Sequence, residues 1–313
     1  MTVPRTVGWG IVLASVTAAI SGVSIFANGL IVKSFPDPVV LTGARNALVG
    51  LVLLAILLTT GGVGEIRELS RRRAGALLAI ALIGGSIPFI LFFSGLAQAT
   101  GPGAAFIHKT MFVWVSLLAV PLLGESLGRM QLVALAVLFA GVVLIGPTGA
   151  VGPGAAEALI LGATLLWAVE VVVARRLLSR EGLSVRLAST ARMALGALLI
   201  LGYLAVDGRL GGIGALTPEQ WGLVGVTGAL LLGYVTTWYA ALQRAPAALV
   251  SSVLVGGAVL TAGLAVMRTG TVPAPAVETG LALLAIGVVM AMAAWRRPVP
   301  VVAGRVESVG GPR

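Results

Sequence analysis

The sequence predicts an all-α membrane protein with ten transmembrane helices, built as two inverted five-helix repeats with the N and C termini in the cytoplasm. Three observations support this fold class: the composition, the length of the apolar stretches and a repeat between the halves. Hydrophobic residues make up 58% of the chain and charged residues only 10%, with a mean hydropathy of +1.07. A soluble domain carries roughly 25% charged residues, so this composition indicates a chain that lies in a bilayer.

The predicted helices follow one another with short breaks. Each apolar stretch has about 20 residues, the length at which a helix crosses the hydrocarbon core of a membrane. The first stretch is too long for a signal-peptide core, so we expect it to be a retained helix. Proline and glycine pairs mark several of the breaks. The ten stretches span residues 9–33, 38–60, 74–97, 101–122, 127–146, 156–178, 185–206, 221–243, 247–268 and 275–295.

The basic residues predict the orientation of these helices. If the N-terminus is cytoplasmic, most of the 21 lysines and arginines fall in cytoplasmic segments, and the outer segments hold only Lys33, Arg209 and Arg268. This bias places both termini inside. The sequence pI of about 11.4 does not indicate a nucleic-acid partner, because the basic residues lie in short loops beside apolar stretches, where they orient the chain in the bilayer.

The two halves of the chain resemble each other at a separation of about 143 to 147 residues. Thr42-Gly-Ala-Arg45 in the second stretch matches Ser189-Thr-Ala-Arg192 in the seventh. Because five helices is an odd number, the second half must enter the membrane upside down relative to the first. Inverted repeats of this kind predict a pseudo-two-fold axis in the membrane plane and a site near the midplane that is exposed alternately to each side.

Several loose motifs occur in a fixed order along the chain. Each half has an early tryptophan or glycine in its first helix, an arginine in its second (Arg45, Arg192) and an alanine-rich entry to its fourth; the first half also has Pro121-Leu-Leu-Gly-Glu125 at the end of its fourth helix. In this order and spacing the chain resembles the paired EamA domains of the drug/metabolite transporter superfamily. It departs from the pattern at Met267–Arg268, where the second half lacks the acidic residue.

The resemblance implies a domain organisation and a function. The first EamA-like repeat would span residues 9–146, the second and inverted repeat 156–295, and a cytoplasmic tail 296–313. Such a protein is a secondary transporter of the plasma (inner) membrane, with a central cavity lined by its first, third, fourth, sixth, eighth and ninth helices. Members of similar sequence move amino acids and other small metabolites, often outward, without a cofactor.

Two charged residues within the stretches are the leading candidates for a substrate site. At about 1.5 Å of rise per residue, Lys109 lies roughly 10 Å below the outer surface and Glu170 slightly to the cytoplasmic side of the midplane. The two could pair directly, or through substrate or water, which would reduce their desolvation cost. They would anchor a carboxylate or an amine, with Trp114 and Trp167 as an apolar wall. The alternative is an ion pair that only holds two helices together.

For each of the other candidate residues, the sequence allows both a functional role and a structural role. His108 is the single histidine and could carry a coupling proton, or it could simply bond a backbone carbonyl. Arg45 and Arg192 lie within reach of opposite membrane faces, so we expect structural charges that snorkel outward. Asn28, Trp238 and Ser251 could line the cavity or satisfy contacts between helices.

Two prolines interrupt predicted helices. Pro88 lies midway along the third stretch and Pro121 near the end of the fourth, where each removes a backbone hydrogen bond. The loss would let these helices bend as gates. A static kink is an equally simple interpretation.

An enzyme is not expected. The chain has no cysteine, a single histidine and no metalloprotease motif, and its glycine-rich stretches lie inside apolar helices rather than in phosphate loops. The competing functions are a flippase for a lipid-linked substrate and a membrane scaffold or receptor that transports nothing. The expected partners are therefore a small-molecule substrate, the lipid bilayer and a coupling proton, with no nucleic acid and no metal.

Overall fold

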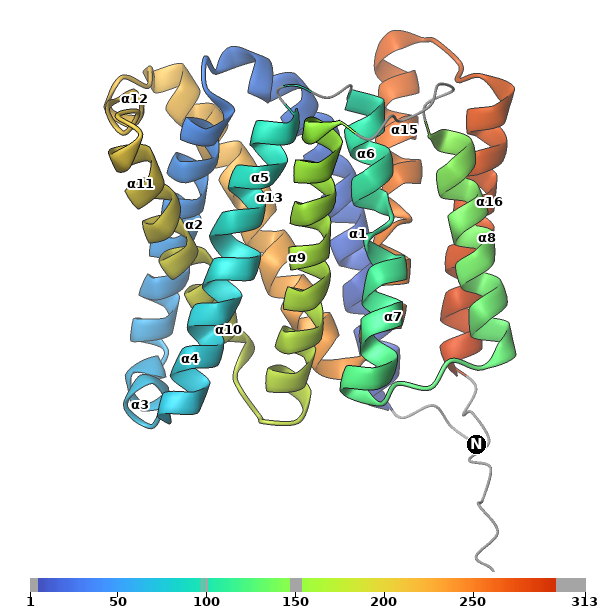
Figure 1. The fold of residues 1–313 in the computed structure, drawn as a ribbon, viewed down its shortest axis with the longest axis horizontal. Coiled ribbons are helices and arrows are strands. Elements are labelled where there is room, and N and C mark those ends of the chain that lie inside the picture. The colour runs from blue at the N-terminus through green and yellow to red at the C-terminus, as the bar shows by residue number, and fades with distance from the viewer. Residues whose placement is uncertain (1–4, 97, 99–100, 147–153, 297–313) are drawn as a thin grey trace, which may run out of the picture.

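The structure, a computed structural model, describes residues 5–96, 98, 101–146 and 154–296, and over them it is a bundle of helices (Figure 1). Within these residues, nine helical spans are long and apolar enough to cross a membrane, and a tenth apolar helix, Arg129–Ile145, is shorter. The predicted multi-pass helical membrane protein is confirmed. Residues 297–313 of the expected cytoplasmic tail lie outside the described part of the chain.

The helices agree closely with the predicted stretches, although several spans contain more than one helical element. The first five spans are α1 (Arg5–Ile31), α2 (Pro38–Thr59), α4 with α5 (Arg71–Ile80, Ile87–Leu96), α6 with α7 (Gly101–Lys109, Met111–Leu123) and α8 (Arg129–Ile145). The next five are α9 (Ala155–Ser179), α10 with α11 (Val185–Thr190, Gly196–Val206), α13 (Pro218–Arg244), α14 with α15 (Ala247–Leu254, Gly257–Thr269) and α16 (Pro275–Arg296). Short helices α3 (Gly62–Arg67) and α12 (Gly211–Gly214) lie at the ends of the bundle.

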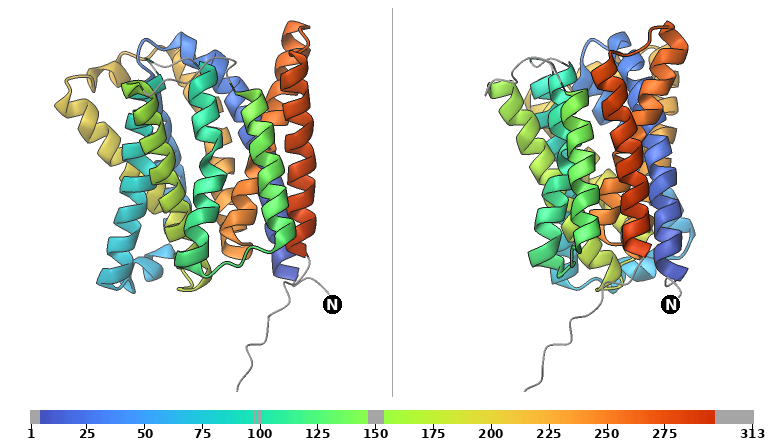
Figure 2. Two further views of the ribbon diagram at one scale, coloured as in Figure 1. Left: turned by 45° about the vertical axis from the view of Figure 1, so that its right-hand side comes forward. Right: turned by 90° about the vertical axis from the view of Figure 1, so that its right-hand side faces the viewer.

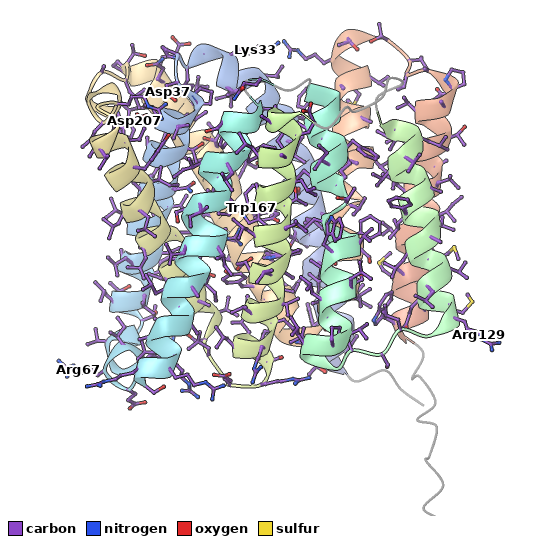
Figure 3. All side chains as sticks on the ribbon, viewed as in Figure 1. Lys33, Asp37, Arg67, Arg129, Trp167 and Asp207 are labelled. Carbon is purple, nitrogen blue, oxygen red and sulfur yellow. The ribbon has the colours of Figure 1, made fainter. Side chains whose placement is uncertain are left out.

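The spans run alternately up and down, so that α1 begins and α16 ends at the same, lower end of the bundle in Figure 1. Figure 3 places Arg67 and Arg129 at this lower end, and Lys33, Asp37 and Asp207 at the upper end. The lower end therefore carries the arginine-rich connections.

Local sequence explains where helices begin. The Asp37 carboxylate caps α2 by accepting from the backbone N–H of Val39 at 2.8 Å, and Pro38 occupies the first helical turn, where no N–H is needed. Ser70 caps α4 in the same way through the N–H of Arg73. Polar caps at the rims let each helix start at the surface while its apolar body lies deeper.

The surface of the bundle is apolar as well as its core. Large side chains such as Leu51, Leu198 and Val289 are more than half exposed, and buried residues of both halves form one main core around α9 and α13. A water-soluble monomer rarely exposes so much apolar surface, whereas a lipid-facing surface requires it. Contacts between the halves pair α8 with α16, α1 with α13 to α15, and α9 with α5 to α7, as the views in Figure 2 also show.

Four of the spans are interrupted. The fourth breaks at Thr110 between α6 and α7, and the ninth breaks at Val255–Gly256 between α14 and α15. The third contains a π-helical segment, η2 (Ala81–Ser86), and the seventh another, η3 (Ala191–Leu195). Discontinuous helices and π-bulges inside a membrane leave backbone groups that side chains or ligands can bind, so these breaks indicate where a site can lie.

Candidate functional site

The break at Thr110 directly follows the two candidate residues His108 and Lys109. The Thr110 hydroxyl donates to the carbonyl of Ile107 at 2.6 Å and accepts from the indole N–H of Trp114 at 3.1 Å. The threonine therefore ends α6 by bonding its last turn, and Trp114 fixes the start of α7. Because its N–H is used within its own span, Trp114 offers a site only its ring.

His108 belongs to a cluster of aromatic rings between α5, α6 and α9. Its ring centroid lies 5.0 Å from that of Trp167 and 5.4 Å from that of Phe92, both edge to face, and Phe89 contacts the other edge of Trp167 at 5.3 Å. The Nδ1 atom of His108 is buried and has no hydrogen-bond partner. This cluster is a mainly apolar wall that carries one polar ring nitrogen.

Trp167 lies about halfway between the two ends of the bundle, as Figure 3 shows. Its indole N–H donates to the carbonyl of Gly84 at 3.1 Å. That carbonyl precedes Pro88 by four residues, and because proline has no N–H, it cannot accept the usual α-helical bond from that position. Pro88 thus leaves free the acceptor that Trp167 uses, and it lies two residues after the π-helical segment η2, which packs against α9.

Glu170 pairs with Arg192 and not with Lys109, which corrects the pairing expected from depth alone. A guanidinium nitrogen of Arg192 lies 3.7 Å from Oε2 of Glu170, and the hydroxyl of Tyr239 donates to Oε1 of the same carboxylate. The Arg192 guanidinium also lies over the Tyr239 ring, 5.7 Å from its centroid. These groups join α9, η3 and α13 in the centre of the bundle.

Glycines make this pairing possible. A Cβ on Gly84 would lie 2.4 Å from Cγ of Glu170, and a Cβ on Gly85 would lie 2.1 Å from the backbone oxygen of Arg192. With no side chains there, η2 and η3 cross almost backbone to backbone, and Glu170 and Arg192 are only 1% and 6% exposed. The expectation that Arg192 snorkels to a membrane face is wrong, because its charge is buried beside a carboxylate.

Arg45 is also buried, although no carboxylate of the described residues pairs with it. It is 7% exposed, and one of its terminal nitrogens lies 3.4 Å from the side-chain oxygen of Asn28, which in turn donates to Ser24 at 3.0 Å. Its Nε and both polar atoms of the neighbouring Asn46 side chain are buried without partners. Arg45 therefore does not snorkel either; it is a buried cation with only an amide partner.

Trp238 and Ser251 lie in packed surroundings. Trp238 is 1% exposed and stacks on Tyr234 with ring centroids 6.0 Å apart. The Ser251 hydroxyl donates to the carbonyl of Ala248 within α14 and is equally buried. The Ser251 hydroxyl is therefore used within its own helix, and the Trp238 ring contributes to the packing.

Lys109 has no carboxylate partner among the ion pairs and hydrogen bonds of the described residues, although it is only partly exposed. His108 contacts Trp167, and Trp167 and Glu170 both lie against Gly84, so the structure brings these three predicted residues into one region. Lys109 is the chain neighbour of His108. Asn28 and Arg45 form a second group, while Trp238 and Ser251 belong to neither.

Pro121 lies at the lower end of α7, and Glu125 follows it in the loop. The Glu125 carboxylate accepts from the backbone N–H groups of Ala247 at 2.6 Å and Ala248 at 3.1 Å, and so caps α14. The Arg175 guanidinium lies 4.0 Å away. Burial raises the pKa of the Glu125 carboxyl, while the N–H donors and Arg175 act in the opposite direction. The loop after Pro121 thus ties the fourth span to the ninth at the lower end.

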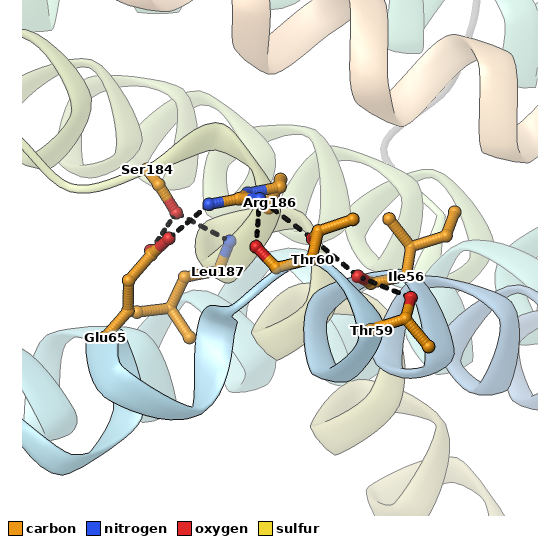
Figure 4. A network of polar contacts seen from close by, with 7 residues as sticks. All are labelled: Ile56, Thr59, Thr60, Glu65, Ser184, Arg186 and Leu187. Atoms are coloured by element: carbon orange, nitrogen blue, oxygen red, sulfur yellow. Dashed lines mark hydrogen bonds and ion pairs between the residues drawn. The ribbon is translucent and has the colours of Figure 1, made fainter.

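A second tie at the lower end joins the second span to the seventh. Figure 4 shows Arg186 donating to the Thr60 carbonyl at 2.9 Å and to Glu65 at 2.6 Å, while Ser184, the cap of α10, donates to the same carboxylate. Within the described chain, no group of three or more histidine, aspartate or glutamate side chains could hold a metal ion.

Sequence reasoning missed three contributors to the central region. Tyr239 is one of three tyrosines, Phe92 is one of many apolar residues, and Thr110 gives no local signal of a break. Such contacts depend on how each helix is rotated about its own axis. The depth of a residue in the membrane does not give that rotation.

Comparisons with known proteins agree with this architecture. A family model described as the EamA-like transporter family matches residues 8–146. Over these residues the chain belongs to the EamA-like transporter family. A solved structure titled only "Crystal structure of protein" is 20% identical, covers 90% of this chain and 97% of its own, and superposes with a TM-score of 0.72. At that identity the likeness shows the fold alone. No curated protein matches the chain.

The family assignment confirms the resemblance seen in the sequence, and an EamA-like protein is a membrane transporter rather than an enzyme. The matched residues hold Pro88, His108, Lys109, Thr110 and Glu125, so the broken fourth span lies inside the assigned part. Glu170 and Arg192 lie beyond it.

Proposed function

We propose that this EamA-like transporter exports amino acids or similarly small polar metabolites by alternating access. Its termini would lie in the cytoplasm and its lower, arginine-rich end would face inward in the plasma membrane. The observation that carries the proposal is the break in the fourth span immediately after Lys109, a cation in the apolar bundle that has no acidic partner in the described chain. A break of this kind near a charged residue is typical of transporter substrate sites.

The contacts between the halves support an inverted repeat over residues 9–146 and 156–295. The first span packs on the eighth and ninth, and the sixth packs on the third and fourth. Exchanging each helix for its counterpart in the other half converts one set of contacts into the other. A pseudo-two-fold axis has this effect, and it lets one half move against the other around a shared site.

The two broken spans add a second line of support. Thr110 in the fourth span and Val255–Gly256 in the ninth are separated by nearly the same number of residues as Arg45 and Arg192. The breaks therefore fall at corresponding places in the two halves, and α7 packs against α14. Exposed backbone groups at paired breaks can bind a polar solute in an otherwise apolar bundle.

The charges favour a substrate that carries a carboxylate. Glu170 is engaged by Arg192 and Tyr239, so it positions the central helices, while Lys109 remains free to attract an anionic group. The aromatic wall of His108, Trp167 and Phe92 lies beside it and would contact the apolar part of the solute. His108 would carry the coupling proton, because its Nδ1 has no partner in this conformation.

A flux assay tests the function. Purified protein is first screened against a metabolite panel by thermal shift, since a ligand of the folded state raises the unfolding temperature. Hits are then loaded into proteoliposomes and their efflux is measured. We expect Lys109→Ala to reduce flux about tenfold or more, the loss expected for one charge-assisted contact, and Lys109→Arg to retain part of it.

Arg129→Ala is the matched control, because it removes a cation from the lower end of the bundle, away from the break. Its flux should equal that of the unmodified protein. Absence of flux for every thermal-shift hit would reject the transporter and favour a scaffold or receptor. Normal flux in Lys109→Ala would remove Lys109 from the substrate site.

A further inference from the structure

A cavity of about 490 Å³ opens at the lower end of the bundle, between the start of α4 and the end of α9. It is separate from the central region around Lys109 and Glu170, and it is lined from both halves of the chain. Its lining residues are Ser70, Arg72, Arg73, Arg176, Arg180 and Glu181.

The positive charges of this cavity are only partly neutralised. Its one carboxylate, on Glu181, lies 3.9 Å from Arg72 and 3.6 Å from Arg176. Arg73 instead donates to the backbone carbonyl of Glu181 at 2.7 Å, and Arg180 donates to the backbone carbonyl of Leu123. A carbonyl is neutral, so neither hydrogen bond offsets the guanidinium charge, although the Arg180 charge also interacts with the Glu125 carboxylate.

The backbone around the cavity holds the arginines in place. Ser70 caps α4, and its hydroxyl accepts from the N–H of Arg73 at 3.3 Å. The positive end of the α4 dipole therefore points toward the same opening as the arginines. The carbonyls that accept from Arg73 and Arg180 fix one edge of each guanidinium and leave other N–H groups for a ligand.

We propose that this cavity binds a phosphate group, carried either by the head of an anionic phospholipid or by a free phosphorylated solute. Guanidinium groups bind phosphate oxygens bidentately, and four of them around one carboxylate leave a net positive charge that a phosphate would partly offset. The cavity lies at the ends of membrane-spanning helices, at the level where lipid heads lie. A phosphate there would bridge α4 and the segment after α9, and so hold the two halves together at this end.

Orientation in the membrane alone does not account for the arrangement. Basic residues anywhere at the lower end would orient the chain in the membrane. Arg67 and Arg129 lie at this end and do not line the cavity. Four arginines from two distant segments that converge on one hollow are a more specific arrangement. Arg67 and Arg129 therefore provide a control of equal charge.

The test measures binding and not transport, so its outcome is independent of the proposed function. The full-length protein in neutral detergent is titrated with phosphatidylglycerol, phosphatidylcholine or inorganic phosphate at constant ionic strength, and the unfolding temperature is recorded. We expect a saturable rise with phosphatidylglycerol that phosphatidylcholine does not give. A rise with inorganic phosphate as well identifies a site open to free phosphorylated solutes, and a rise with the lipid alone identifies a lipid site.

Paired variants decide whether the cavity is responsible. Arg73→Gln with Arg180→Gln should weaken the response about tenfold or more, because charge-assisted hydrogen bonds are lost, whereas Arg67→Gln with Arg129→Gln should leave it unchanged. Arg72→Gln serves as a milder variant that folds, since its side chain is 77% exposed, and it should weaken the response less. An equal loss in both double variants, or no saturable response in the unmodified protein, would overturn the proposal.

Discussion

Trp167 donates its indole N–H to the backbone carbonyl of Gly84, across the contact between the sixth span and the third. The acceptor is available because Pro88, four residues later, has no N–H to bond it. Trp167 in the second half of the chain therefore supplies the donor that Pro88 in the first half lacks. The pair explains why the interrupted third span is stable in an apolar environment.

Replacing Trp167 tests this match. Trp167→Phe leaves a buried carbonyl without its donor, and we expect a loss of about 1–3 kcal/mol in the free energy of unfolding. In a Pro88→Ala background, the backbone N–H gained at position 88 can donate to the Gly84 carbonyl. Trp167→Phe should therefore lower the free energy of unfolding by less in that background. Unfolding in denaturant of the four proteins measures the coupling; equal costs in both backgrounds would show that Pro88 and Trp167 act independently.

The buried pair of Glu170 and Arg192 is predicted to be structural. Glu170→Gln should leave the Arg192 charge uncompensated and reduce the free energy of unfolding by about 3–5 kcal/mol, a size typical of broken buried pairs. Adding Arg192→Met to Glu170→Gln should recover part of the stability. Unfolding temperature and the yield of monodisperse protein provide the measurement, and full stability of the single variant would contradict the assignment.

The cap formed by Glu125 predicts a dependence of stability on pH. Because burial raises the pKa of this carboxyl above its ordinary value of 4.5, the folded chain holds the proton to a higher pH than the unfolded chain does. Stability should therefore fall as the pH rises from 4.5 through the folded-state pKa, and level off above it. Glu125→Gln should remove this slope. An identical pH profile of the unfolding temperature in the variant would assign the slope to another group.

Proton coupling through His108 gives a prediction about flux. With an imposed pH gradient across proteoliposomes, the unmodified protein should accumulate substrate on one side. His108→Ala should abolish the accumulation while solute exchange continues, because only the proton carrier is lost. Phe92→Leu is a suitable control, since it alters the same aromatic cluster without removing a titratable group. An unchanged response in His108→Ala would exclude His108 from the coupling step.

Hydropathy alone predicted the helical spans to within a few residues. The seventh, predicted at 185–206, is observed at Val185–Val206. Two starts differ for a physical reason: the third span begins at Arg71 and the eighth at Pro218, because Ser70 and Thr217 cap helices whose first turns lie outside the apolar stretch. Hydropathy detects the membrane-embedded part of a helix, whereas caps set its ends.

The site was less accessible to sequence reasoning. The position of Glu170 along its helix gives its depth in the membrane, but it does not reveal which way the side chain faces. The Glu170–Arg192 pair depends on the close crossing at Gly85, and in so glycine-rich a chain no single glycine signals a crossing. Rotation of the helices and contacts between the halves arise only from the complete packing.

The crossing at Gly85 also limits how this protein can move. A Cβ on Gly196 would lie 2.7 Å from Cα of Gly85, so the third and seventh spans touch with no side chain between them that could change rotamer. Sliding one past the other would break the contact outright. We therefore expect any rocking of one half against the other to pivot about this contact instead of sliding along it.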